Sequence, residues 1–188
     1  MITLIVGPMY GGKSTALIQK MERYIYAKKS ICFIRPIRDD RGYITHNGLR
    51  DVQQKLTSRD LTLEIPEFTK DLVKRLEQFD AVFIDEYFMI HNCKLLCTNS
   101  VKPNIYFAGL LATSENELFE ETKEILPYCD DIIKLNGVCM GLDEPCGSQI
   151  ANYSAYFGKS VKGGQIKVGD SEYKCLCREC YKKAFGKL

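Results

Sequence analysis

Hydrophobic residues in the first two thirds of the chain follow two different spacings. Short, continuous apolar runs, which are typical of buried strands, occur at five places. They are residues 3–6, 31–34, 81–84, 104–108 and 132–135. Apolar positions between them recur at helical spacing, which predicts helices at residues 14–28, 69–78 and 117–126. Strands that alternate with helices predict an α/β fold, in which helices flank a parallel sheet.

This pattern stops near Asn136. The remaining residues are rich in Gly, Cys, Lys and Tyr and hold few large apolar side chains. The whole chain has 188 residues, which is enough for one compact domain and a small appendage. We therefore expect an α/β domain at residues 1–135 and a small C-terminal lobe, with little hydrophobic core of its own, at residues 136–188.

Charge and hydropathy exclude several classes of partner. The formal net charge is only +2, which argues against a surface built to bind nucleic acid or an anionic membrane. No apolar run is long enough to cross a bilayer. The first ten residues lack the basic flank of a signal peptide and resemble a first strand instead. These features predict a cytoplasmic protein with neither nucleic acid nor membrane as a partner.

A glycine-rich motif follows the first predicted strand. Residues 7–14, GPMYGGKS, fit the pattern G-x-x-x-x-G-K-[ST], which places backbone N–H groups and a helix N-terminus around phosphate oxygens. Lys13 would reach the β- and γ-phosphates of ATP, and the Ser14 hydroxyl would bind Mg²⁺. The predicted nucleotide-binding residues are Gly7, Pro8, Met9, Tyr10, Gly11, Gly12, Lys13, Ser14 and Thr15. The motif predicts a P-loop NTPase-like fold.

Two acids stand at the end of the predicted strand at residues 81–84. Asp85 has the position of the magnesium-associated aspartate of many P-loop proteins. Glu86, next to it, could accept a proton from a hydroxyl group that attacks the γ-phosphate. A solvated strand end would carry the same residues, but together with the upstream P-loop they favour a kinase.

Several segments together resemble the type II thymidine kinases, a family of cellular and viral enzymes. The similarity extends from residue 3 to about residue 181. It is carried by GPMYGGKST at 7–15, RDDRGYITHNG at 38–48, FIDE at 83–86, FAGL at 107–110, VCMG at 138–141 and CLCREC at 175–180. The resemblance implies an ATP-dependent kinase that phosphorylates the 5′-hydroxyl of thymidine or deoxyuridine in deoxynucleotide salvage and works as a homotetramer.

The resemblance also implies roles for individual residues. Glu86 would be the catalytic base, and Asp39 and Arg41 would help to hold magnesium and the phosphates. A lasso loop would close over the nucleobase and bind it through its main chain. The implied substrate contacts are Met9, Arg41, Leu110, Phe119, Ile166, Lys167, Val168, Gly169 and Tyr173.

The chain departs from the family's pattern near the nucleobase. Tyr87 and Phe88 stand where the family has a glutamine and a phenylalanine, Leu111 replaces an aspartate, and Ser114 replaces an aromatic residue. Because none of these positions belongs to the phosphate site, phosphoryl transfer is the firmer prediction, and the preferred base stays open.

Five of the nine cysteines lie in the last third of the chain. Cys177 and Cys180 form a C-x₂-C pair, and Cys139 and Cys146 form a wider pair that we interpret as a knuckle with an insertion. With four protein ligands, such a zinc site would be structural. Cys175 would be a substitute ligand or a spare thiol. The alternative is a set of buried free thiols.

Two other function classes fit parts of the sequence. A P-loop protein could hydrolyse ATP or GTP without a nucleoside acceptor. A non-enzymatic relative could use the zinc lobe to bind protein or nucleic acid, although the low net charge argues against it.

Overall fold

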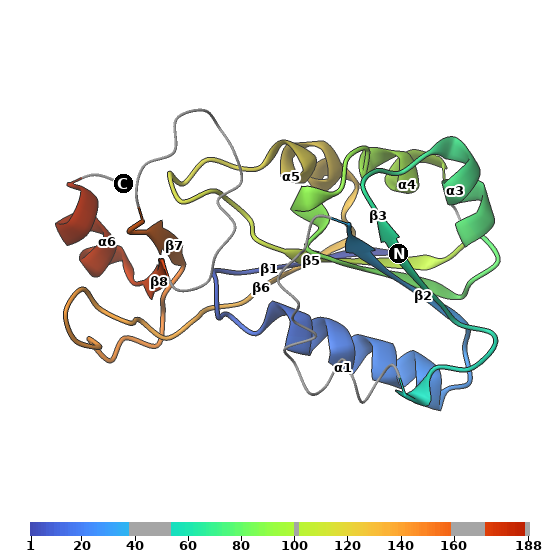
Figure 1. Cartoon of the computed structure of the whole chain (residues 1–188), viewed down its shortest axis with the longest axis horizontal. Coiled ribbons are helices and arrows are strands. Elements are labelled where there is room, and N and C mark those ends of the chain that lie inside the picture. The colour runs from blue at the N-terminus through green and yellow to red at the C-terminus, as the bar shows by residue number, and fades with distance from the viewer. Residues whose placement is uncertain (38–53, 100–101, 159–171, 187–188) are drawn as a thin grey trace.

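A six-stranded sheet forms the centre of the protein (Figure 1). The computed structural model describes residues 1–37, 54–99, 102–158 and 172–186. The strand order is β3-β2-β4-β5-β1-β6, and every neighbouring pair is parallel. The strands are β1 (Ile2–Val6), β2 (Ile31–Pro36), β3 (Leu61–Ile65), β4 (Ala81–Asp85), β5 (Asn104–Gly109) and β6 (Asp131–Lys134).

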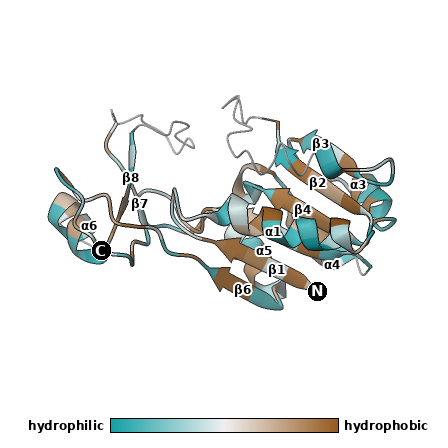
Figure 2. Ribbon diagram, turned by 90° about the horizontal axis from the view of Figure 1, so that it is seen from below, coloured by the Kyte–Doolittle hydropathy of each residue, from teal (hydrophilic) through white to brown (hydrophobic). Residues whose placement is uncertain are grey.

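Helices cover both faces of this sheet (Figures 1 and 2). Helix α1 (Lys13–Tyr26) packs on one face, and α3 (Lys70–Leu76), α4 (Lys94–Asn99) and α5 (Glu120–Ile125) pack on the other. Successive strand residues point to opposite faces, so neighbouring apolar side chains enter different cores. In β4, for example, Phe83 packs under α1 while Ile84 packs under the other three helices. Continuous apolar strands are therefore required here.

The predicted α/β fold is confirmed, and the five predicted strands are present. The strand β3, at the edge of the sheet, was not among the predicted strands. Its Leu61 and Leu63 are half-buried while Thr62 and Glu64 are exposed, so it lacks the continuous apolar run of the central strands. Two short 3₁₀ helices, η1 (Tyr87–Met89) and η2 (Leu126–Tyr128), complete the described part of this region.

The C-terminal lobe lies beyond one end of the sheet (Figure 1). It contains an antiparallel hairpin of β7 (Tyr153–Tyr156) and β8 (Tyr173–Leu176), followed by α6 (Arg178–Phe185). A small buried cluster holds it together, and half of that cluster is cysteine. Its members are Cys139, Ala151, Ala155, Cys175, Leu176, Cys177, Cys180 and Tyr181. The lobe thus has a hydrophobic core of its own, but this core holds fewer buried residues than either of the two cores that flank the sheet.

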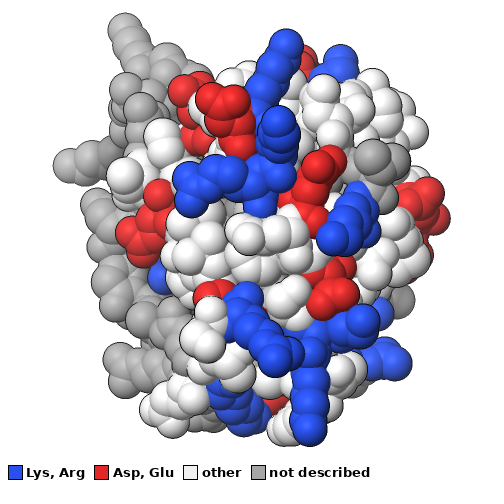
Figure 3. All heavy atoms as spheres, turned by 90° about the vertical axis from the view of Figure 1, so that its right-hand side faces the viewer, with Lys and Arg blue, Asp and Glu red and all other residues white. Residues whose placement is uncertain are grey.

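The surface shown in Figure 3 carries positive and negative side chains interspersed, as expected from the low net charge. Among the described residues, no helix is long and apolar enough to cross a membrane.

Candidate functional site: a phosphate-binding loop, an acidic pair and a cysteine cluster

The glycine-rich motif forms the turn between β1 and α1. Gly12 has a φ of 78°, in the left-handed region that favours glycine. At Gly7, a side chain would lie 2.9 Å from the backbone oxygen of Leu135, so only glycine fits without a shift. Helix α1 then begins at Lys13 with no acidic residue in its first turn and no side-chain cap. Its N-terminal N–H groups are therefore suited to an anion.

Lys13 lies across this loop and is almost fully buried. Its Nζ donates a hydrogen bond to the backbone oxygen of Pro8, at 2.8 Å. The backbone N–H of Gly11 donates to the same oxygen, at 3.1 Å. The loop thus holds the ammonium group at its centre, which is where a phosphate-binding lysine of this motif has to act.

The acidic strand end meets the P-loop directly. The Ser14 hydroxyl donates to Oδ1 of Asp85 at 3.3 Å, and the backbone N–H of Glu86 donates to the same oxygen at 3.2 Å. Burial, followed by the negative charge of Glu86, raises the pKa of Asp85 to about 7, although Lys13 opposes this rise. A buried carboxylate beside a hydroxyl oxygen supplies the hard oxygen ligands that Mg²⁺ prefers, so the residues fit this ion.

Glu86 has an unusual backbone conformation. Its φ of 49° and ψ of 44° lie in the left-handed region, which residues with side chains adopt at an energetic cost. Strain of this kind is concentrated at functional sites, because the surrounding structure must enforce it. Here the enforcing elements are β4, which ends at Asp85, and η1, whose Tyr87 and Phe88 are buried.

The departures at Tyr87 and Phe88 belong to the hydrophobic core. The Tyr87 hydroxyl bonds to Thr122 Oγ1 at 2.7 Å and donates to the backbone oxygen of Leu110 at 3.2 Å. Phe88 stacks on Phe119 with ring centroids 4.5 Å apart. These contacts fix Leu110 and Phe119, the two predicted base contacts on this side, against the core.

Two further departures lie in the segment that follows β5. Leu111 packs against the larger core. Ser114 accepts a hydrogen bond at its backbone oxygen from the hydroxyl of Tyr181, at 2.8 Å. Because Tyr181 belongs to α6, this bond joins the C-terminal lobe to the segment after β5. The predicted substrate contact Tyr173 lies in β8, with its ring centroid 5.0 Å from that of Tyr156.

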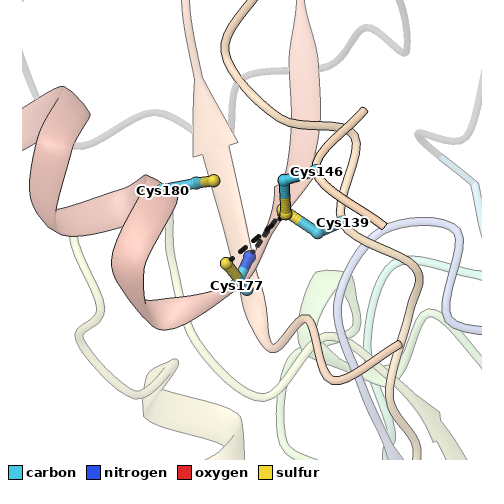
Figure 4. Close-up of side chains that lie close together, drawn as sticks. All are labelled: Cys139, Cys146, Cys177 and Cys180. Carbon is cyan, nitrogen blue, oxygen red and sulfur yellow. Dashed lines mark hydrogen bonds between the residues drawn. The ribbon is translucent and has the colours of Figure 1, made fainter. Parts of the chain in front are cut away.

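Four cysteines converge in the C-terminal lobe, as the sequence predicts (Figure 4). The sulfur atoms of Cys139, Cys146, Cys177 and Cys180 all lie within 4.8 Å of one another. The Cys177 backbone N–H donates to Cys139 Sγ at 3.1 Å, and the Cys146 and Cys177 sulfurs are 3.9 Å apart. Four thiols at these distances fit a tetrahedral Zn²⁺ ion with no open position. Cys175 is outside this group.

The six residues between Cys139 and Cys146 fold so that the wide pair still meets. Gly141 has a φ of 68°, and a side chain there would collide with the backbone oxygen of Glu144. Lys174 donates to the backbone oxygen of Leu142 and so ties the segment to β8. The insertion is therefore accommodated as a tight turn that needs glycine.

Some predicted site residues lie outside the described residues. They are Asp39, Arg41, Ile166, Lys167, Val168 and Gly169. Two contacts between the lobe and the sheet region were not predicted from the sequence. Tyr181 bonds to Ser114, and the hydroxyl oxygen of Ser154, in β7, accepts a hydrogen bond from the backbone N–H of Met9 at 2.9 Å. No local pattern distinguishes this serine from any other in a strand.

A parallel sheet with a phosphate-binding turn after its first strand is the architecture of the P-loop nucleotide-binding proteins. Within that class, the model of the thymidine kinase family matches residues 1–181. The chain belongs to the thymidine kinase family and is a phosphotransferase.

Individual thymidine kinases can be aligned with this chain over nearly its whole length. The chain is 31% identical over 197 residues to the thymidine kinase of Pseudothermotoga lettingae, covering 99% of this chain and 97% of that protein. It is 30% identical over 183 residues to the thymidine kinase of myxoma virus, covering 96% and 95%. The sheeppox virus thymidine kinase is 28% identical over 187 residues, covering 96% of both.

Proposed function

We propose that the protein is an ATP-dependent nucleoside kinase. It transfers the γ-phosphoryl group of ATP to the 5′-hydroxyl of thymidine or deoxyuridine and so supplies 5′-monophosphates for DNA synthesis by salvage. The observation that carries the proposal is the contact between the P-loop and the acidic pair. The Ser14 hydroxyl bonds to Asp85, which directly precedes Glu86 in the chain. Membership of the thymidine kinase family supports the nucleoside as the acceptor.

The P-loop would bind the phosphates of ATP. Residues 7–15 would surround them with backbone N–H groups, and the N-terminus of α1 would add its positive end. Lys13 donates to the Pro8 oxygen, and because its ammonium group has three N–H donors, it would bind a phosphate oxygen while keeping this bond. A bond from this ammonium group to an ionised phosphate oxygen would be charged at both ends, which makes it short and strong.

Ser14 and Asp85 would hold Mg²⁺. The ion neutralises charge on the phosphate oxygens when it is bound. It would also favour the ionised form of Asp85, whose pKa is raised by burial and by Glu86. Asp39 and Arg41 would complete the phosphate side of the site, with Arg41 stabilising the charge on the transferred group.

Glu86 would act as the catalytic base. It would accept the proton of the 5′-hydroxyl and orient that oxygen for in-line attack on the γ-phosphorus. Glu86 directly follows Asp85 and its charge acts on that carboxyl group, so the two acids would act on the same phosphoryl group.

The nucleoside would lie between the sheet region and the lobe. Met9, Leu110 and Phe119 would contact it from the sheet side, and Tyr173 from β8. The main chain of the lasso residues Ile166, Lys167, Val168 and Gly169 would pair with the base edge, since buried polar groups that lose their partners are costly. Tyr87 contacts Leu110, and Phe88 contacts Phe119. Tyr87 and Phe88, which differ from the family's pattern, would therefore affect base binding through Leu110 and Phe119.

The four cysteines would bind a structural Zn²⁺ ion that stabilises the lobe. A core as small as that of the lobe rarely supplies enough stability alone, and a structural metal would add to it. As the family resemblance implies, we propose that the enzyme works as a homotetramer in the cytoplasm, without nucleic acid or membrane as a partner.

The test is a nucleoside panel with zinc-loaded protein, ATP and magnesium. ADP formation is followed with thymidine, deoxyuridine, deoxycytidine and purine nucleosides. ADP that appears with thymidine or deoxyuridine supports the proposal. ADP formation with another nucleoside alone would retain the mechanism and reassign the base. ADP formation that is independent of every nucleoside would identify an NTPase and overturn the proposal.

A further inference from the structure

One peptide unit of the P-loop is held at both of its ends. The backbone oxygen of Pro8 accepts hydrogen bonds from Lys13 Nζ at 2.8 Å and from the Gly11 N–H at 3.1 Å. The N–H of the same peptide unit, which belongs to Met9, donates to Ser154 Oγ at 2.9 Å. The first two bonds lie within the P-loop, whereas the third comes from β7 of the C-terminal lobe.

The planarity of the peptide group links these bonds. The C=O of Pro8 and the N–H of Met9 lie in one rigid plane and point in opposite directions. The plane cannot turn its N–H away from Ser154 without turning its C=O away from Lys13. The hydroxyl of Ser154 therefore restrains the acceptor that positions the Lys13 ammonium group.

Ser154 is itself well fixed. It is buried in β7, where it pairs with Cys175 of β8. Gly137 is close to both the hairpin and the P-loop, since a side chain there would lie 2.5 Å from Cys175 Sγ and 3.4 Å from Cγ of Pro8. Two backbone hydrogen bonds between Gly137 and Ala151 hold this approach, at 2.9 and 3.0 Å. Gly137 thus lies between the hairpin and the P-loop, beside the bond that Ser154 makes.

We propose that Ser154 is a positioning residue for the phosphate site. Through the peptide unit between Pro8 and Met9 it fixes the P-loop and Lys13 for the nucleotide, and it makes ATP binding depend on the C-terminal lobe. The proposal rests on the proposed function, in that the P-loop binds ATP. It adds a residue from outside the P-loop to the set that determines nucleotide affinity.

The test compares three variants of the full, zinc-loaded protein. Ser154→Ala removes the hydroxyl, Ser154→Thr retains it, and Ser148→Ala removes a different lobe hydroxyl, one that accepts from the Ile150 N–H at 3.3 Å. The Kd of Mg·ADP is measured by calorimetry, and the KM values of ATP and thymidine are measured separately. Calorimetry needs no turnover, so loss of kinase activity alone does not obscure the result.

We expect Ser154→Ala to weaken Mg·ADP binding about fivefold to tenfold, the effect of losing one hydrogen bond within a preorganised site. The KM of ATP should rise more than the KM of thymidine. Ser154→Thr should return Mg·ADP affinity to within about twofold of the wild type, and Ser148→Ala should leave it unchanged. Together these results would assign the effect to the Ser154 hydroxyl.

Unchanged Mg·ADP affinity in Ser154→Ala would overturn the proposal. An equal loss in Ser154→Thr or in Ser148→Ala would do the same, because the effect would then follow from general damage to the lobe. Hydrogen exchange of the Met9 amide in the wild-type protein gives a test that needs no variant. The bond to Ser154 predicts a protected amide, and exchange at the rate of an exposed one would contradict it. A wild type that binds Mg·ADP but phosphorylates no nucleoside would overturn the proposed function only.

Discussion

Replacement of Asp85 by asparagine should stabilise the protein while removing its activity. Burial and the charge of Glu86 raise the pKa of Asp85 from 3.8 to about 7. Between these two values the folded state binds more protons than the unfolded state, so the stability contributed by this group falls as the pH rises. Above both values the ionised carboxylate opposes folding. Asparagine keeps the shape and an oxygen acceptor for Ser14, but it carries no charge.

The magnitude follows from the pKa change. One pKa unit corresponds to about 1.4 kcal/mol, so the ionised Asp85 costs the folded state on the order of 4 kcal/mol at about pH 8. We expect Asp85→Asn to raise the free energy of unfolding by about 2–4 kcal/mol at that pH, because the amide will not reproduce every contact of the protonated acid. Near pH 4 the carboxyl is protonated in the folded state, and the difference should shrink to about 1 kcal/mol or less.

The assay is urea unfolding across this pH range, with zinc retained and magnesium and nucleotide left out. Asp80→Asn is the matched control of opposite sign. A hydrogen bond from the Ser30 backbone N–H lowers the pKa of Asp80, so its ionised form stabilises the fold and the variant should be less stable at about pH 8. A destabilised Asp85→Asn at this pH, or a gain that does not depend on pH, would show that the ionised Asp85 does not oppose folding.

Three further substitutions test the lobe and the core. Cys177→Ser should release zinc and lower the unfolding temperature, as measured by metal analysis and a thermal scan. The same change at the buried Cys93, which lies outside the cluster, should leave the zinc content intact. Loss of zinc from both variants would contradict the assignment of Cys177 as a zinc ligand. Gly137→Ala should lower the free energy of unfolding by about 1–3 kcal/mol in urea, because its methyl group would overlap Cys175 Sγ. If the double variant with Cys175→Ala recovers none of this loss, the clash with Cys175 is not the cause. Tyr87→Phe should lower the free energy of unfolding by about 1–2 kcal/mol in the same assay, since the buried Thr122 hydroxyl loses the Tyr87 hydroxyl as a partner. An unchanged urea midpoint would show that this hydrogen bond contributes nothing to stability.

Local sequence patterns predicted the elements that position the site. The P-loop could be found from its glycines and Lys13 because a phosphate-binding turn requires fixed spacing. The central strands could be found because both of their faces are buried, which demands continuous apolar runs. Asp85 and Glu86 could be found because they end such a run. The four cysteines could be grouped because few other roles explain a C-x₂-C pair near two further thiols.

The features that the sequence could not predict depend on contacts between distant segments. The edge strand β3 has one exposed face and therefore no continuous apolar run. The bonds from Ser154 to the P-loop and from Tyr181 to Ser114 join residues 145 and 67 positions apart, and neither has a local signature. The raised pKa of Asp85 likewise arises from burial by the completed fold.

Under the proposed function, this chain phosphorylates a nucleoside with Glu86 as the base. The most direct measurement is chromatographic detection of thymidine 5′-monophosphate after incubation with ATP, magnesium and thymidine, for the wild type and for Glu86→Gln. We expect the monophosphate with the wild type, a rate reduced about 100-fold or more in the variant, and Mg·ADP binding that is equal in both proteins. Monophosphate formation at the wild-type rate by Glu86→Gln would show that Glu86 is not the base.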